Sequence, residues 1–223
     1  MNHAGKADKS RTLTIIGIIA MLLMISTKAL PSHHIEGYSI FVGLAFFFII
    51  EAVTKTPEAE SGLRFTTIPK DLKKPGALFW MLLPIASAVI SILLGKLLFN
   101  DGYVNHVLGR TDSLLSFDKI PLLIGQLIIG AFGEEIAFRG FFVGKGMKQF
   151  PYWICALVSS AAFAAAHFSA GSAGIVIFDL AGIFIDSLIY STVYRKTGNC
   201  VISTIAHLLC NVSGLLITFT FFR

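Results

Sequence analysis

The sequence predicts an all-α membrane protein, built as one polytopic bundle of about seven transmembrane helices. Hydrophobic residues make up 55% of its 223 residues, charged residues make up only 14%, and the mean hydropathy is +0.76. Soluble domains contain about 25% charged residues, so the charge content alone sets this chain apart from them. The length suits one compact bundle without a separate soluble domain, and residues 1–223 are therefore predicted to form a single membrane domain.

Residues 12–119 contain three apolar runs that are predicted to cross the membrane: 13–27, 38–53, and 77–99 with a kink at Pro84. The first run follows a basic stretch, as in a secretory signal, but no A-x-A-like cleavage site follows it and more spans come later. It is therefore predicted to be a transmembrane helix. The segments 55–76 and 100–119 are predicted to be loops, because prolines break any helix in the first and both signs of charge occur in the second.

Residues 120–222 are predicted to form the catalytic core, with four further spans: 120–147, 152–167, 175–194 and 200–222. If the N-terminus is cytoplasmic, most Lys and Arg residues of the loops fall on the cytoplasmic side, as the positive-inside rule requires. The chain is thus predicted to be a multi-pass protein of a cell membrane, in contact with the lipid bilayer, with its N-terminus in the cytoplasm.

Charge and cysteine content exclude two other classes of function. The formal net charge is +5, but the basic residues are scattered between apolar runs and make no continuous patch, which argues against a nucleic-acid partner. Cys155, Cys200 and Cys210 have neither C-x-x-C nor any other metal-ligand spacing. They are predicted to be small buried apolar residues.

The stretch from Gly133 to Gly140 places Glu134, Glu135 and Arg139 inside an apolar run, where ionisable groups are costly and usually functional. Neighbouring helical residues point about 100° apart, so the two glutamates are poorly placed to share a proton. Glu135 and Arg139 are four residues apart, a spacing that favours an ion pair on one helix face. Glu134 is left for another partner. The alternative is a buried ion cluster that only locks the bundle.

Two later spans add polar side chains at helical spacing. Phe163 lies one turn before His167 in an alanine-rich run, and His207 lies one turn before Asn211. With a rise of about 1.5 Å per residue from the predicted cytoplasmic ends, Glu134, both histidines and the asparagine fall in one layer.

A layer of one glutamate, two histidines and one asparagine suits the hydrolysis of an amide. The carboxylate can take a proton from water while one histidine holds that water in line. The second histidine and the asparagine amide can donate hydrogen bonds to the oxygen that becomes negative. Histidine and carboxylate also bind zinc, but no H-E-x-x-H pair is present, so residue chemistry alone leaves a metal undecided.

The ordered set E-E-x-x-x-R, F-x-x-x-H and H-x-x-x-N on successive spans resembles the three motifs of the CPBP family of intramembrane proteases. That family includes type II CAAX prenyl endopeptidases, bacteriocin-processing and immunity proteins, and abortive-infection proteins. The resemblance covers about residues 120–216 and is similar to the compact bacterial members, which implies a bacterial cell membrane. It implies an endopeptidase that cleaves a peptide or a membrane-protein tail, and it favours a mechanism without a metal cofactor.

The resemblance also implies roles for single residues. Glu134 matches the family's water-activating glutamate, and His167 matches the histidine that shares this water. His207 and Asn211 match the pair that stabilises the oxyanion. The supporting positions of the first two motifs are those of Glu135, Arg139 and Phe163.

Two further hypotheses belong to other classes of function. One is a non-catalytic bacteriocin-immunity or interaction protein, in which the polar layer only shapes a cavity. The other is a proton-coupled carrier that uses Glu134, Asp179 and Asp186, but no inverted pair of broken helices supports it. The two aspartates are seven residues apart on one helix face, where they either line a substrate entrance or bond to polar groups of neighbouring helices.

Overall fold

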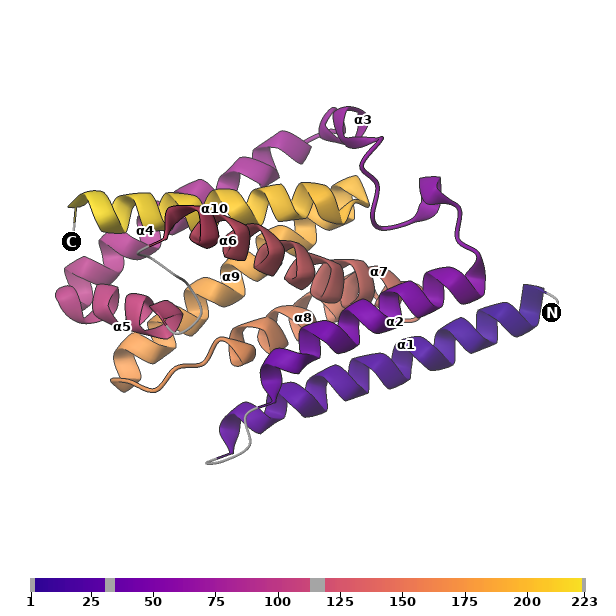
Figure 1. Cartoon of the computed structure of the whole chain (residues 1–223), viewed down its shortest axis with the longest axis horizontal. Helices are drawn as coiled ribbons and strands as arrows, with labels where there is room; N and C mark the ends of the chain where they lie inside the picture. The colour runs from indigo at the N-terminus through magenta and orange to yellow at the C-terminus, as the bar shows by residue number, and fades with distance from the viewer. Residues whose placement is uncertain (1–2, 31–34, 113–118, 222–223) are drawn as a thin grey trace.

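The computed structural model describes residues 3–30, 35–112 and 119–221, and within these ranges every regular element is a helix (Figure 1). The longer helices are α1 His3–Ser26, α2 Ser39–Thr54, α4 Ala77–Phe99, α5 Asp101–Asp112, α6 Ile120–Glu134, α8 Tyr152–Ala166, α9 Ala173–Thr197 and α10 Cys200–Phe221. The short helices are α3 Ile68–Leu72 and α7 Gly144–Gly146, with 3₁₀ turns at Thr27–Ala29, Glu36–Tyr38 and Glu58–Glu60. A π-helical segment, η4, covers Glu135–Val143 between α6 and α7.

Six helical stretches in the described ranges are long and apolar enough to cross a membrane, which confirms the all-α polytopic bundle. The predicted fifth span is the exception, because α8 has only 15 residues. At about 1.5 Å per residue it is roughly 22 Å long, shorter than a hydrocarbon core of about 30 Å. Its C-terminal end therefore lies inside the bundle at the level of the polar residues.

The helices form two packed groups around a central segment (Figure 1). Helices α1 and α2 lie side by side as one pair, and α4, α9 and α10 pack together as the other group. The central segment η4 contacts α2, α8 and α10, and α8 packs mainly on α9. The stretch that carries Glu135 and Arg139 is therefore surrounded by protein.

Close contacts between helices require small residues around η4. A Cβ atom added at Gly43 of α2 would lie 2.6 Å from the Cβ atom of Ala137, and one added at Gly140 would lie 2.8 Å from Cys200 Sγ of α10. The core at this level is aromatic, with Phe47, Phe138 and Phe141 almost fully buried. The glycines let α2 and α10 approach the π-helical segment directly.

Both predicted loops contain helices. In the segment 55–76, Pro69 lies in the first turn of α3, where its missing N–H costs nothing, so it begins a helix instead of breaking one. In the segment 100–119, α5 forms because it buries Tyr103 and Val104, and the Tyr103 ring packs 5.1 Å from the Phe178 ring of α9. The remainder of that segment, 113–118, and residue 222 of the last predicted span lie outside the described residues.

Two predictions about the spans and one about the cysteines can be compared with the structure. Helix α4 continues through Pro84, which is buried within it. The predicted span 120–147 is confirmed as one helical stretch, Ile120–Gly146, but its backbone changes from α to π at Glu135. The three cysteines are buried and free, as the sequence predicts.

A group of polar residues, which we call the Asp71 cluster, joins α3 to the turn between α9 and α10. It consists of Arg64, Thr67, Asp71, Lys74 and Asn199. Asp71 Oδ1 lies 2.8 Å from Lys74 Nζ, and Asp71 Oδ2 lies 2.6 to 3.2 Å from donors of the other three residues. Burial raises the pKa of the Asp71 carboxyl, but these partners outweigh burial and hold the pKa well below its usual range.

Candidate active site

The backbone around Glu135 is wound more loosely than an α-helix. The N–H of Gly144 donates to the carbonyl oxygen of Arg139, five residues back, which is the bonding pattern of a π-helix. Ser159 of α8, fully buried, donates from Oγ to the carbonyl oxygen of Phe138 at 3.2 Å. A neighbouring helix thus satisfies backbone in this segment, as a spanning helix with altered bonding requires.

Glu135 and Arg139 form the ion pair that their spacing predicts. Arg139 Nη1 lies 3.0 Å from Glu135 Oε1, and both side chains are fully buried. Arg139 Nη2 also donates to Ser187 of α9, at 2.7 Å to Oγ and 3.2 Å to the carbonyl oxygen. The guanidinium carbon lies 4.6 Å from the ring centre of Phe163 and 5.2 Å from that of Tyr190. The hydrogen bonds from Nη2 and the two aromatic rings hold the guanidinium beside Glu135.

His207 of α10 lies between the two glutamates. Its Nδ1 is 3.1 Å from Glu135 Oε1, and its Nε2 is 3.7 Å from Glu134 Oε2. The imidazole stacks on Tyr190, with ring centres 4.7 Å apart and an interplanar angle of 19°, and meets the edge of Phe163 at 5.9 Å. Because Glu135 is paired with Arg139, it is the acceptor and His207 Nδ1–H is the donor.

Glu134 differs from Glu135 in its exposure and in its hydrogen bonding. Its side chain is 19% exposed, whereas the Glu135 side chain is fully buried. Within the described ranges its carboxylate accepts no hydrogen bond, because the 3.7 Å to His207 Nε2 is too long for one. This carboxylate is therefore available to a reactant.

His167 lies at the C-terminal cap of α8, where the short helix ends. Its Nδ1 is 2.8 Å from the carbonyl oxygen of Phe163, and its ring lies 4.5 Å from the Phe163 ring. A neutral imidazole that donates from Nδ1 has an unprotonated Nε2, which can accept a proton or a hydrogen bond. The side chain is half-buried, and the Glu134 carboxylate is close enough to act on the ring electrostatically.

Asn211 lies one turn beyond His207 on α10 and is half-buried. Among the described residues its amide forms no hydrogen bond, so its alignment with the other side chains rests on its place in the helix. The structure thus brings together six of the seven residues that the sequence singles out: Glu134, Glu135, Arg139, Phe163, His167 and His207.

Three residues of the site were missed by sequence reasoning: Ser159, Ser187 and Tyr190. All three are buried, and they bind the backbone of η4, the guanidinium of Arg139 and the ring of His207 respectively. The sole sequence signal is the three-residue spacing of Ser187 and Tyr190 on one face of an apolar span. Such a pair is common in membrane helices, and no motif distinguishes it.

The two aspartates of α9 bond to neighbouring helices. Asp179 is 3% exposed, and its Oδ2 lies 3.2 Å from Arg110 Nε and 3.5 Å from His106 Nε2 of α5. Asp186 Oδ2 accepts from Cys210 Sγ of α10 at 3.5 Å. Because Arg110 neutralises Asp179, this carboxylate is a poor member of a proton relay.

The possible metal ligands of the described ranges do not form a cluster. Over the described ranges, no three His, Cys, Asp or Glu side chains converge in a geometry that could hold a metal ion. Within the polar layer, His207 binds Glu135 through one nitrogen, and His167 bonds to backbone through one of its own.

A model of a known protein family matches part of this chain. Residues 116–213 match the family model described as Type II CAAX prenyl endopeptidase Rce1-like. This agrees with the CPBP family that the motifs resemble, and the matched range contains every site residue from Glu134 to Asn211. No curated protein and no solved structure matches the chain. The match of residues 116–213 to this family model, together with six long apolar helices in the described ranges, supports intramembrane endopeptidase activity in general.

Proposed function

We propose that the Rce1-like domain cleaves a peptide bond in a membrane-associated peptide or protein tail, using water activated by Glu134. One observation carries the proposal. Of two adjacent glutamates, Glu135 is fully buried and paired with Arg139 at 3.0 Å, whereas Glu134 is partly exposed and has no hydrogen-bond partner in the described structure. A carboxylate in apolar surroundings without a fixed partner suits a general base.

In the proposed first step, a water molecule lies between Glu134 and His167. The carboxylate takes one proton from the water, and the unprotonated Nε2 of His167 accepts a hydrogen bond from the other O–H. The hydroxide then attacks the carbonyl carbon of the scissile bond. The fixed bond from His167 Nδ1 to the Phe163 carbonyl, at 2.8 Å, supports this role because it determines which nitrogen faces the water.

The negative oxygen of the tetrahedral intermediate needs donors. One donor in the proposal is His207 in its doubly protonated form, with Nε2 on the side of Glu134 and Nδ1 on the side of Glu135. In that form Nδ1–H binds Glu135 and Nε2–H is free to bind the oxyanion, with the amide of Asn211 as the second donor. When the C–N bond breaks, Glu134 passes its proton to the leaving nitrogen, which gives a carboxylic acid and an amine.

The proposed chemistry needs no metal ion. No three His, Cys, Asp or Glu side chains of the described ranges converge in a geometry that could hold a metal ion, which supports water activation by the Glu134 carboxylate itself. Peptide release by purified protein should therefore be unchanged by a chelator of divalent cations, measured after dialysis against the chelator. Loss of release, restored by added zinc, contradicts the metal-free mechanism.

The central test compares wild-type and Glu134→Gln protein in reconstituted membranes by mass spectrometry of released peptides. We expect release to fall by roughly a thousandfold, because a general base contributes about 10²- to 10⁴-fold. Glu60→Gln is the matched control, since it makes the same change at an exposed position outside the polar layer and should cleave normally.

Two outcomes decide against the proposal. Full peptide release by Glu134→Gln excludes its role as the base. If wild-type protein releases nothing while Glu134→Gln protects cells from a bacteriocin as well as wild type, the chain is a non-catalytic immunity protein.

We further propose that the protein lies in a bacterial cell membrane. Its N-terminus is in the cytoplasm, as the basic residues of its loops suggest. Labelling of a cysteine introduced near residue 6 tests this orientation.

A further inference from the structure

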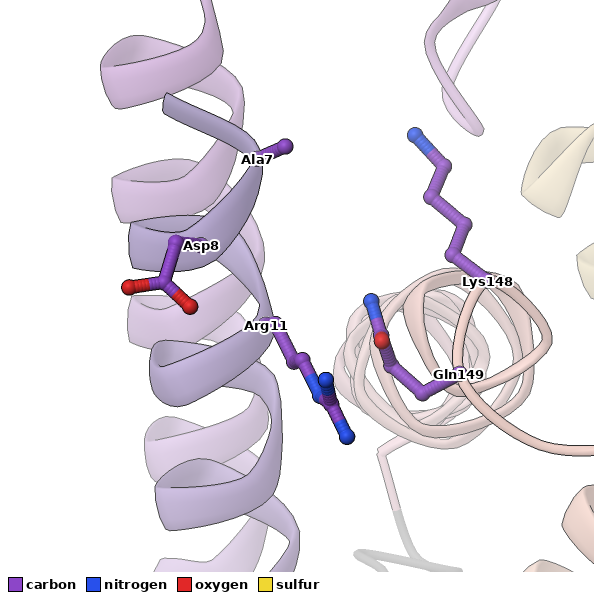
Figure 2. Close-up of a pocket in the computed structure, with 5 residues that line it drawn as sticks. All are labelled: Ala7, Asp8, Arg11, Lys148 and Gln149. Carbon is purple, nitrogen blue, oxygen red and sulfur yellow. The ribbon is translucent and has the colours of Figure 1, made fainter. Parts of the chain in front are cut away.

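A cleft of about 370 Å³ opens at the end of the bundle where α1 begins and α7 ends (Figure 2). Its lining residues come from α1 and from the turn between α7 and α8: Ala7, Asp8, Arg11, Lys148 and Gln149. Figure 2 shows the Arg11 side chain and the Gln149 amide extending toward each other from the two walls. Lys148 lies on the same wall as Gln149, with its ammonium directed away from the Arg11 guanidinium. The Asp8 carboxylate points to the opposite side of α1, away from the space between the two walls.

The inner face of this cleft therefore presents donors. Arg11 and Lys148 are both exposed, and in the described part of the chain neither forms an ion pair. A guanidinium has five N–H donors and no acceptor, an ammonium has three donors, and the Gln149 amide adds two more. Donors on both walls of one cleft, two of them on positively charged side chains, suit an anion that carries several oxygens, and phosphate is such an anion.

The position of the cleft indicates where this phosphate comes from. One candidate span begins at Lys6 and another ends at Gly146, so the cleft lies where two spans meet the membrane surface. Phe150 and Trp153, which follow Gln149 at once, are 43% and 61% exposed. Exposed aromatic side chains beside the ends of spans are typical of the headgroup level of a bilayer. A phosphate at this depth belongs to a lipid whose acyl chains run along the bundle.

We propose that Arg11, Lys148 and Gln149 bind the phosphate of an anionic phospholipid headgroup. The bound lipid joins the start of α1 to the turn that precedes α8, and α1 already contacts both α7 and α8. Since α8 carries His167 at its other end, the lipid stabilises the packing of the helix that completes the polar layer. The site itself is independent of the endopeptidase reaction.

Native mass spectrometry of the full chain in detergent, titrated with phosphatidylglycerol or phosphatidylcholine, tests the site. We expect one tightly retained phosphatidylglycerol and much weaker retention of phosphatidylcholine. One basic residue near an anionic surface is worth roughly fivefold in affinity, so Arg11→Gln/Lys148→Gln should bind phosphatidylglycerol about 30-fold more weakly. Arg11→Lys keeps the charge and should lose less than Arg11→Gln.

The control variant is Lys55→Gln/Lys70→Gln, which removes two exposed positive charges outside the cleft. It should bind the lipid within about twofold of wild type, because the effect depends on the cleft and not on net charge. Equal weakening in both double variants overturns the proposal, as does wild-type binding by Arg11→Gln/Lys148→Gln. Inorganic phosphate and glycerol phosphate serve as soluble competitors. Displacement of the lipid by either at equal concentration overturns the assignment to a lipid.

Discussion

Asp71 and Glu135 are both buried carboxylates paired with arginine, but their surroundings differ. In the Asp71 cluster both carboxylate oxygens are held, Oδ1 by Lys74 and Oδ2 by three further donors. Around His207, Glu135 is held by Arg139 and by His207 itself, but the adjacent Glu134 has no hydrogen-bond partner in the described structure. A saturated cluster can only hold elements together, whereas a cluster with one uncommitted carboxylate can also bind and activate a reactant.

The largest expected effect is on the chemistry of the His207 site. His207→Ala should lower kcat by about 10²- to 10³-fold with little change in KM, because it removes a donor that acts on the oxyanion in the transition state. Steady-state kinetics on a peptide that wild-type protein cleaves provide the measurement. Thermal unfolding in detergent should stay near wild type. A loss confined to KM contradicts the role in the chemical step.

The Asp71 cluster should respond in the opposite way. Asp71→Asn should reduce the free energy of unfolding by about 3 kcal/mol, the lower end of the cost of breaking a buried ion pair. Folded protein at low temperature should keep its wild-type kcat, since the cluster joins α3 to the α9–α10 turn and touches no residue of the polar layer. A variant that is stable but inactive shows that the two regions are coupled.

The same cluster predicts a pH dependence of stability. The pKa of Asp71 is lower in the folded protein than its ordinary value of 3.8, so its contribution is fully present above about pH 4. It is lost progressively as the pH falls below that value. The melting temperature of wild-type protein should therefore fall between pH 5 and pH 3 more steeply than that of Asp71→Asn, which lacks the titrating group. Parallel curves for the two proteins contradict the assignment.

A smaller effect is expected from Tyr190, which lies beneath both His207 and Arg139. Tyr190→Leu removes the ring that fixes the plane of the imidazole and should lower kcat by roughly tenfold, equivalent to about 1.4 kcal/mol. Tyr190→Phe keeps the ring and should retain most activity. Equal activity in the leucine and phenylalanine variants, both folded, shows that stacking does not orient His207.

Local features of the site could be predicted from the sequence because they depend on residues close together in the chain. The four-residue spacing of Glu135 and Arg139 predicts their ion pair, and the spacing of Phe163 and His167 predicts their contact. The apolar runs predict seven spans because hydropathy averages over many residues, and six of them are long and apolar enough to cross a membrane in the described structure. The bounds of α8 were predicted to within one residue, but its 15 residues are too few for a full span.

What the sequence determined by itself is the membrane bundle, its polar residues and the pairs formed within one turn, all of which follow from hydropathy and helical periodicity. The tertiary structure decided the rest. His207 reaches Glu135 across 72 residues, and Asn199 reaches Asp71 across 128. The π-helical winding at Glu135 also depends on neighbours, because Ser159 satisfies its backbone and Gly140 admits α10. Contacts between distant segments leave no periodic trace in the chain, so only the folded bundle shows that His207 lies between the two glutamates.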